Sequence, residues 1–154
     1  TLYETMVAAV RSKDSGARTV AEALLADYPN TPYGVGAALM LARLELEGGN
    51  VAAAKAQLNW VLENTTEASF RHAATLRLAR IALDEGDHDS ARMLLEPSGD
   101  SFQSMYDELR GDILAQSGDR RAAQIAYDAA LVALTGRSGV RDLLQVKRDR
   151  IATD

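Results

Sequence analysis

Three glycines, each followed by asparagine or aspartate, recur along the chain and restrict its possible folds more than any other feature. The pairs are Gly49-Asn50, Gly86-Asp87 and Gly118-Asp119, so the glycines are separated by 37 and 32 residues. Glycine readily adopts the left-handed conformation that ends a helix, and Asn or Asp is a preferred cap for the helix that follows. A turn of this kind, repeated at this interval, predicts pairs of helices stacked in an array.

Small and large apolar residues recur at fixed distances from these turns. Small residues precede the three turns (Ala42, Ala79, Gly111) and follow them (Ala54, Ala91, Ala123), and a large apolar residue stands nine positions after each glycine (Leu58, Leu95, Tyr127). Small side chains allow two helices to approach closely. One helix pair cannot bury its apolar face alone, so neighbouring pairs are expected to stack.

Helix caps and apolar periodicity predict nine helices. Composition agrees, because Ala and Leu, two strong helix formers, supply 27 and 20 of the 154 residues, whereas proline occurs only three times. Thr31 and Pro32 are expected to begin one helix, and Asn64 with Glu67 resembles a capping box. The predicted helices cover residues 2–12, 17–27, 32–47, 51–63, 66–85, 88–95, 101–117, 120–134 and 139–152.

Charge and composition exclude several classes of function. The net charge is −5 and no dense Lys/Arg stripe is present, which argues against nucleic-acid binding. No run approaches the roughly 18 to 20 apolar residues of a membrane helix, and zero cysteines exclude disulfides and thiolate zinc sites. Because the chain opens with Thr1 and lacks a signal peptide, we expect it to be a soluble piece of a longer product.

Signals for catalysis or a cofactor are weak. Of the two histidines, His88 lies in the sequence Glu85-Gly86-Asp87-His88-Asp89, whose spacing matches no calcium or zinc motif. No Gly-x-Ser-x-Gly turn and no phosphate-binding glycine loop occurs. We therefore expect no enzyme activity, no cofactor and no metal. A small hydrolase or metal protein remains the alternative from another class, and it would lose thermal stability in the presence of a chelator.

With these repeats in view, the chain resembles tetratricopeptide-repeat proteins, whose period is about 34 residues. More specifically, it resembles the YfgM-type ancillary subunits of the bacterial Sec translocon. The segment YDELRGDILAQSGDRRAAQIAYDAAL (106–131) is similar to the last repeat of that family, NTPYGVGAALMLARL (30–44) to the start of its first full repeat, and LRLARIALDEGDHDSARMLLE (76–96) to its middle repeat.

This resemblance implies a non-catalytic interaction scaffold. Family members are single-pass inner-membrane proteins with this domain in the periplasm, where they associate with the SecYEG translocon and a PpiD-type chaperone and link secretory clients to chaperones. The resemblance therefore implies protein partners, no nucleic acid, and membrane attachment only through a span that lies outside this sequence. The alternative is a generic tetratricopeptide adaptor of another envelope or cytoplasmic assembly.

The expected fold is an all-α, tetratricopeptide-like, right-handed helical solenoid that forms one domain over residues 1–154. It comprises an irregular N-terminal helix pair (1–30), three repeats (31–64, 66–96, 101–135) and a C-terminal capping helix (138–154). In that last helix, Val140, Leu143, Leu144 and Ile151 are expected to face the core. Its basic run 147–150 and Arg141 are expected to face solvent.

The first helix of each pair should line the concave face of such an array, and the expected partner-binding residues lie there. Matching spacings of i, i+4 and i+7 select Leu39, Arg43 and Leu46, then Leu76, Arg80 and Leu83, to which Met105 and Asp112 are added. Leucines would pack against apolar side chains of a partner, and the arginines would hold its carboxylates or carbonyls. The alternative is that Leu39 and Leu76 pack within the array, while the arginines pair with Glu45, Asp84 or Asp112.

Overall fold

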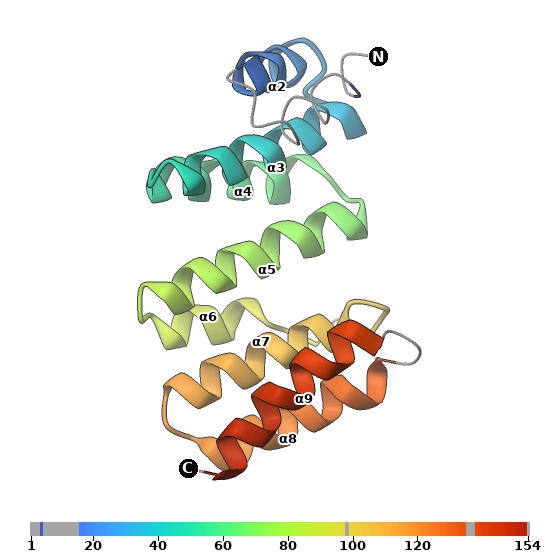
Figure 1. Ribbon diagram of the computed structural model, residues 1–154. Coiled ribbons are helices and arrows are strands. Elements are labelled where there is room, and N and C mark those ends of the chain that lie inside the picture. Colours follow the sequence, from blue (N-terminus) through green and yellow to red (C-terminus); the bar gives the residue numbers. More distant parts are fainter. Residues whose placement is uncertain (1–3, 5–15, 98, 135–137, 154) are drawn as a thin grey trace. The chain divides into compact units, whose positions relative to one another are not determined.

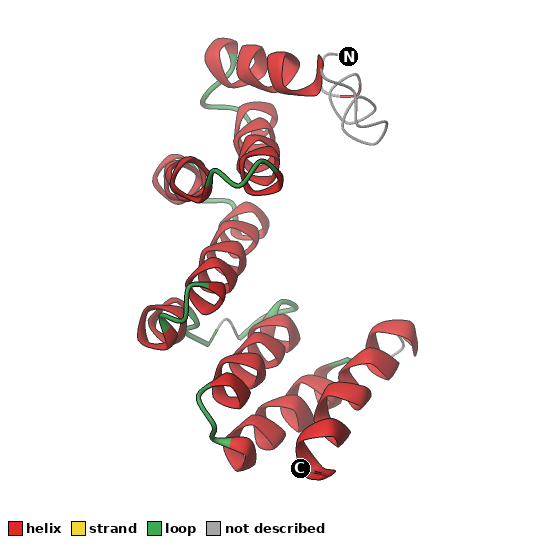
Figure 2. Cartoon of the chain, turned by 60° about the vertical axis from the view of Figure 1, so that its left-hand side comes forward, coloured by secondary structure: helices red, strands yellow, loops and turns green. Residues whose placement is uncertain are grey.

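The computed structural model describes residues 4, 16–97, 99–134 and 138–153 of the chain (Figure 1). These residues form helices joined by loops, without a strand (Figure 2). The all-α class is therefore confirmed. The helix predicted over 2–12 lies outside the described residues.

The observed helices begin and end close to the predicted bounds, usually within two residues. They are α2 (Gly16–Asp27), α3 (Pro32–Glu47), α4 (Val51–Asn64), α5 (Ala68–Asp84), α6 (His88–Leu94), α7 (Gln103–Gln116), α8 (Arg120–Ala133) and α9 (Ser138–Thr153). The largest difference is at the start of α5 and of α7, each of which begins two residues later than predicted.

The three repeated turns have one geometry, as the sequence predicts. Gly49, Gly86 and Gly118 have φ values of 79°, 78° and 87°, a region that favours glycine. In each turn the amide of the following residue donates to the carbonyl five residues back, for example Asp119 to Leu114 at 2.9 Å, and the glycine amide donates to the carbonyl three residues back. This pair of bonds is the Schellman motif, which satisfies carbonyls at the helix end.

Capping of the following helix differs among the turns. The carboxylates of Asp87 and Asp119 accept from the amides of Ser90 and Ala122, both at 3.0 Å. Asn50 occupies the corresponding position before α4, but its side chain makes no capping bond and donates instead to Glu45 at 2.9 Å. Asn50 is therefore the N-cap residue of α4, as predicted, but its side chain makes no bond to the helix amides.

Two further predicted helix starts have different outcomes. Thr31 caps α3 by accepting from the Gly34 amide at 3.2 Å, and Pro32 is the first helical residue, as predicted. The capping box at Asn64 and Glu67 does not form. The Asn64 side chain donates back to the carbonyl of Trp60, and the Glu67 amide donates to the hydroxyl of Thr65.

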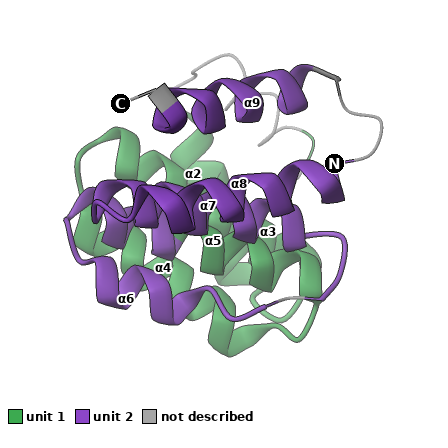
Figure 3. Ribbon diagram, turned by 90° about the horizontal axis from the view of Figure 1, so that it is seen from below, with its two compact units in different colours: residues 1–77 green, residues 78–154 purple. Residues whose placement is uncertain are grey.

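The chain divides into two compact units, residues 1–77 and 78–154, with the boundary inside α5 (Figure 3). In unit 1, α2 packs against α3 around Ala21, Leu24, Ala37 and Leu41, and α3 packs against α4. Trp60, the only tryptophan of the chain, lies partly buried on α4 in this unit. The division into repeats made from the sequence stays a prediction.

In unit 2, α8 packs between α7 and α9. The core there contains Tyr127, Leu131, Leu134 and Leu144, with Ile151 packed at its edge. The small residues predicted to lie at close helix contacts, including Ala79, Ala91 and Ala123, are fully buried. Among the described helices, none has the length and apolar character needed to cross a membrane.

The burial of the side chains of α9 differs from the prediction. Leu144 is buried and Ile151 partly buried, but Val140 and Leu143 are exposed. The basic residues expected in solvent instead contact the unit: Lys147 bonds to α7, Arg148 pairs with Asp128 of α8 at 3.0 Å, and Arg141 donates to the carbonyls of Leu131 and Leu134. Both apolar and basic residues of α9 thus contact the rest of unit 2.

Candidate protein-interaction site

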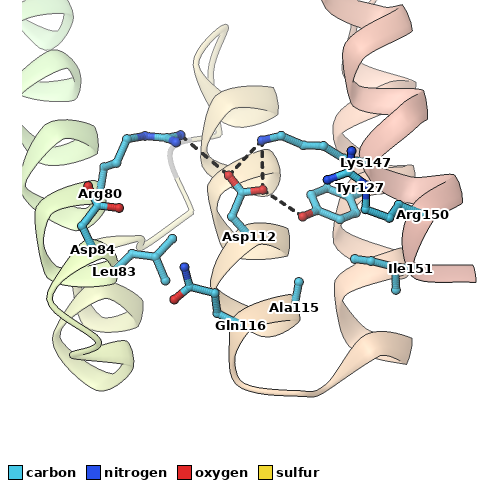
Figure 4. Close-up of a pocket in the computed structure, with 10 residues that line it drawn as sticks. All are labelled: Arg80, Leu83, Asp84, Asp112, Ala115, Gln116, Tyr127, Lys147, Arg150 and Ile151. Carbon is cyan, nitrogen blue, oxygen red and sulfur yellow. Dashed lines mark hydrogen bonds and ion pairs between the residues drawn. The ribbon is translucent and has the colours of Figure 1, made fainter. Parts of the chain in front are cut away.

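Unit 2 contains an open hollow of about 360 Å³ on the surface where α5, α7, α8 and α9 meet (Figure 4). Its lining combines cations, carboxylates and apolar side chains. The residues that line it are Arg80, Leu83, Asp84, Asp112, Ala115, Gln116, Tyr127, Lys147, Arg150 and Ile151.

Asp112 is the centre of the polar contacts in this hollow. Its carboxylate accepts from Lys147 Nζ at 2.9 and 3.0 Å and from the Tyr127 hydroxyl at 2.8 Å, and Arg80 lies 3.8 Å away as an ion pair. Lys147 also donates to Glu108 at 2.8 Å. One carboxylate of α7 therefore joins side chains of α5, α8 and α9.

Burial and charge shift the titration of two of these groups. Burial lowers the pKa of Lys147, but its hydrogen bonds to Glu108 and Asp112 and their negative charges outweigh that effect, so the net pKa is raised. Burial, with the hydrogen bond to Asp112 and the nearby carboxylates, also raises the pKa of Tyr127. Lys147 is thus a cation and Tyr127 a neutral donor at neutral pH, as the bonds to Asp112 require.

Gly111 permits the position of Tyr127. A Cβ atom at residue 111 would lie 2.4 Å from Cε1 and 2.5 Å from Cδ1 of the tyrosine ring. Gly111 and Tyr127 are the small and the large residue that the repeat pattern predicts at these positions, and the glycine leaves space for the tyrosine ring. Because the ring lies against α7, its hydroxyl reaches Asp112.

The structure brings three of the predicted site residues of unit 2 to the hollow. Arg80, Leu83 and Asp112 line it, although Leu83 is only 5% exposed. Met105 is exposed on α7 but is not among the lining residues. The pairing of Arg80 with Asp112 is the alternative considered from the sequence, and the binding role of these residues stays a prediction.

The predicted residues of unit 1 are placed differently. Leu39 is 8% exposed and belongs to the interior, which agrees with the packing alternative, and Leu46 and Leu76 are half-buried. Arg43 pairs with Glu47 at 2.8 Å, not with Glu45, which is held by Arg18 of α2. Glu47 is a partner of Arg43 that the sequence alternative did not include, and the binding role of the predicted residues of unit 1 stays a prediction.

Lys147 and Tyr127, which both bond to Asp112, are among the lining residues that the sequence pattern did not identify as functional. Tyr127 was recognised as a large apolar repeat position, but its hydroxyl role was not. Lys147 was assigned to a solvated face because three other cations lie within nine residues of it on α9. Its spacing from Leu144 and Ile151, three and four residues away on the same helical face, is the signal that points inward.

The lining of the hollow suits contact with a polypeptide. Carboxylate and cation neutralise each other at Asp112, and no group of three or more His, Cys, Asp or Glu residues in the described part of the chain could hold a metal. Apolar side chains beside exposed polar ones can pack against side chains of a partner and hydrogen-bond to its backbone.

A paired-helix fold with Schellman turns at regular intervals and a mixed polar and apolar hollow defines a class of helical-repeat interaction domains. The sequence matches the family described as "Tetratricopeptide repeat-like domain" over residues 1–153, and the chain belongs to this family. The predicted tetratricopeptide-like fold class is thereby confirmed.

Comparison with curated proteins identifies more specific relatives of this chain. The chain is 30% identical over 130 residues to the protein named "Ancillary SecYEG translocon subunit" of Escherichia coli K12, covering 84% of this chain and 63% of the relative. It is 30% identical over 125 residues to the protein of that name from Neisseria gonorrhoeae, covering 80% and 60%. The resemblance inferred from the sequence is confirmed, and the chain spans less than two thirds of these relatives. No solved structure matches it significantly.

Proposed function

We propose that this chain is a non-catalytic protein-interaction scaffold of the Sec translocon. Two findings support the proposal: relatives named ancillary SecYEG translocon subunits align with four fifths of the chain, and the domain family consists of helical repeats. The observation that carries it is the hollow of unit 2, whose apolar and polar lining residues come from four helices.

In this proposal the domain lies on the periplasmic side of the inner membrane and is attached by a single span outside this sequence. It binds SecYEG and a PpiD-type chaperone and passes secretory clients from one to the other. The absence of cysteine is compatible with an oxidising compartment. The Arg80 side chain, 55% exposed at the edge of the hollow, is available to a partner.

The test is capture of purified SecYEG by the immobilised chain. Arg80→Glu places a negative charge beside Asp112 and any carboxylate of the partner. Because like charges at an interface cost several kcal/mol, capture should fall by about tenfold or more. The variant should keep its fold, since the 3.8 Å pair that it removes is largely exposed.

Arg92→Glu is the matched control, because it makes the same charge reversal on an exposed residue of α6 away from the hollow. Capture by this control should equal that of the wild type, and circular dichroism should show unchanged helix content in both variants. Equal capture by Arg80→Glu and wild type would contradict binding at the hollow. Failure of the wild type to capture SecYEG would favour an adaptor of another assembly.

A further inference from the structure

A second feature, in unit 1, is the guanidinium of Arg77, which has no acidic partner among the residues that the structure describes. Arg77 of α5 is partly buried and donates from NH1 to the carbonyl of Leu39 on α3 at 2.9 Å. No carboxylate pairs with it in the described parts of the chain. A main-chain carbonyl orients the side chain but does not neutralise its charge.

A second guanidinium lies close to Arg77. Arg43 stands four residues after Leu39, one turn further along the same face of α3. Burial, and then the positive charge of Arg43, lower the pKa of Arg77. The two cations therefore repel each other, and nothing in the described parts of the chain that bonds to Arg77 compensates for that repulsion.

Arg43 pairs with Glu47 within the described residues, and this partner is easily exchanged. Its Nε atom bonds to Glu47 at 2.8 Å, and the two side chains are 57% and 56% exposed. An exposed i,i+4 pair contributes only about 0.3–0.5 kcal/mol. A carboxylate that reached both arginines would gain more, because desolvated cations bind anions more strongly than exposed cations do.

We propose that Arg43 and Arg77 form a binding site for a carboxylate of a partner polypeptide. Buried charges in proteins are normally paired, so a half-buried arginine that bonds only to a carbonyl is suited to an incoming anion. The planar guanidinium fork matches a carboxylate. Arg43 already binds a carboxylate within this chain, and the half-buried Leu46, three residues further on the same helix, can contact apolar atoms beside the bound group.

This inference rests on the proposed function as an interaction scaffold and specifies the chemistry of what is bound in unit 1. A carboxylate is favoured over a phosphate because the site offers two guanidinia, each already making one hydrogen bond, to Leu39 and to Glu47. A dianionic phosphate would require more donors and more positive charge than these residues supply.

The experiment follows the side-chain Nε–Hε signals of arginine by nuclear magnetic resonance. The whole chain is titrated with the blocked peptide acetyl-Ala-Ala-Asp-Ala-Ala-amide, with the same peptide carrying Asn in place of Asp, and with inorganic phosphate. The Asp peptide should shift the Arg77 and Arg43 signals, whereas the Asn peptide should not. Arg77→Gln should weaken binding of the Asp peptide by about tenfold, as expected when a charge-assisted hydrogen bond is lost.

Arg92→Gln is the matched control for loss of one positive charge and should bind the Asp peptide as the wild type does. Equal binding by Arg77→Gln would overturn the proposal, as would an Arg77 signal that the Asp peptide leaves unchanged in the wild type. Tighter binding of phosphate than of the Asp peptide would overturn the assignment to a carboxylate. The Arg77 and Arg43 signals of the wild type test the carboxylate site even if Arg77→Gln unfolds.

The experiments distinguish failure of the translocon assignment from failure of the carboxylate site. If SecYEG is not captured but the Asp peptide shifts Arg77, the translocon assignment is wrong and the carboxylate site stands. If SecYEG is captured, is lost in Arg80→Glu, and the Asp peptide leaves Arg77 unchanged, the carboxylate site alone is wrong.

Discussion

At the scale of single residues, the contact between Gly111 and Tyr127 shows how the repeat pattern controls chemistry as well as packing. The glycine lets the ring lie on α7, and from there the hydroxyl donates to Asp112 at 2.8 Å. The same carboxylate receives Lys147 from α9. The absence of a side chain at Gly111 thus permits the polar contacts that join α7, α8 and α9 in unit 2.

Gly111→Ala tests this contact. The new Cβ would lie 2.4 Å from a tyrosine ring that is only 3% exposed, so the ring or α7 would have to shift. We expect a loss of about 1–3 kcal/mol in the free energy of unfolding, as for other overpacked sites, measured by urea denaturation. Gly139→Ala is the control, since nothing lies within 4 Å of its Cβ position, and that variant should be as stable as the wild type or more stable. A Gly111→Ala protein of wild-type stability would refute the close contact.

The sequence predicts part of the candidate site. Arg80 and Asp112 were found because they occupy equivalent positions of successive repeats. Lys147 was missed because helical periodicity shows which residues share a face but not which face meets a neighbouring helix. In α9 both faces carry cations and both carry apolar residues, so the spacing of Lys147 from Leu144 and Ile151 is a weak signal when it is taken alone. The carboxylates that accept from Lys147 belong to α7, a separate helix.

At the scale of helices, the bounds could be predicted because each end is determined locally. A glycine with positive φ ends each of three helices, and a residue with a short polar side chain precedes the next one. The starts of α5 and α7 were predicted less accurately. There the side chains of Thr65 and Asp100 accept amides two residues ahead, at Glu67 and Phe102, and such local bonds compete with helix formation.

The difference in capping gives a prediction for two equivalent positions. Asp119→Ala removes the acceptor for the Ala122 amide and should cost about 1 kcal/mol of stability. Asn50→Ala should cost less, because the side chain of Asn50 makes no capping bond. Chemical denaturation of both variants measures the difference. A loss for Asn50→Ala as large as that for Asp119→Ala would contradict this difference between the two caps.

At the scale of the whole molecule, the two compact units contain different kinds of polar contact. In unit 2, Tyr127 and Lys147 both have a raised pKa and both bond to Asp112. In unit 1, Glu45 has a lowered pKa because of its bonds to Arg18 and Asn50. The pKa of Glu45 in unit 1 is therefore shifted in the opposite direction from those of Tyr127 and Lys147 in unit 2.

The alkaline response follows from the sign of these shifts. A group whose pKa is higher in the folded than in the unfolded state contributes stability that is complete below its unfolded value, 10.0 for tyrosine, and is lost as the pH rises above it. Thermal unfolding midpoints of the wild type should therefore fall above about pH 10. In Tyr127→Phe the fall should be smaller, since the contribution of the Tyr127 hydroxyl is then absent. An identical alkaline fall in both proteins would contradict the shift at Tyr127.

Trp60 makes the division into units visible to optical spectroscopy. It is the only tryptophan of the chain and lies on α4, within unit 1, where it is partly buried. Fluorescence excited selectively at tryptophan therefore originates from unit 1 alone, whereas circular dichroism sums the helices of both units. Comparing the two signals during unfolding separates the loss of unit 1 from the loss of unit 2, without any introduced label.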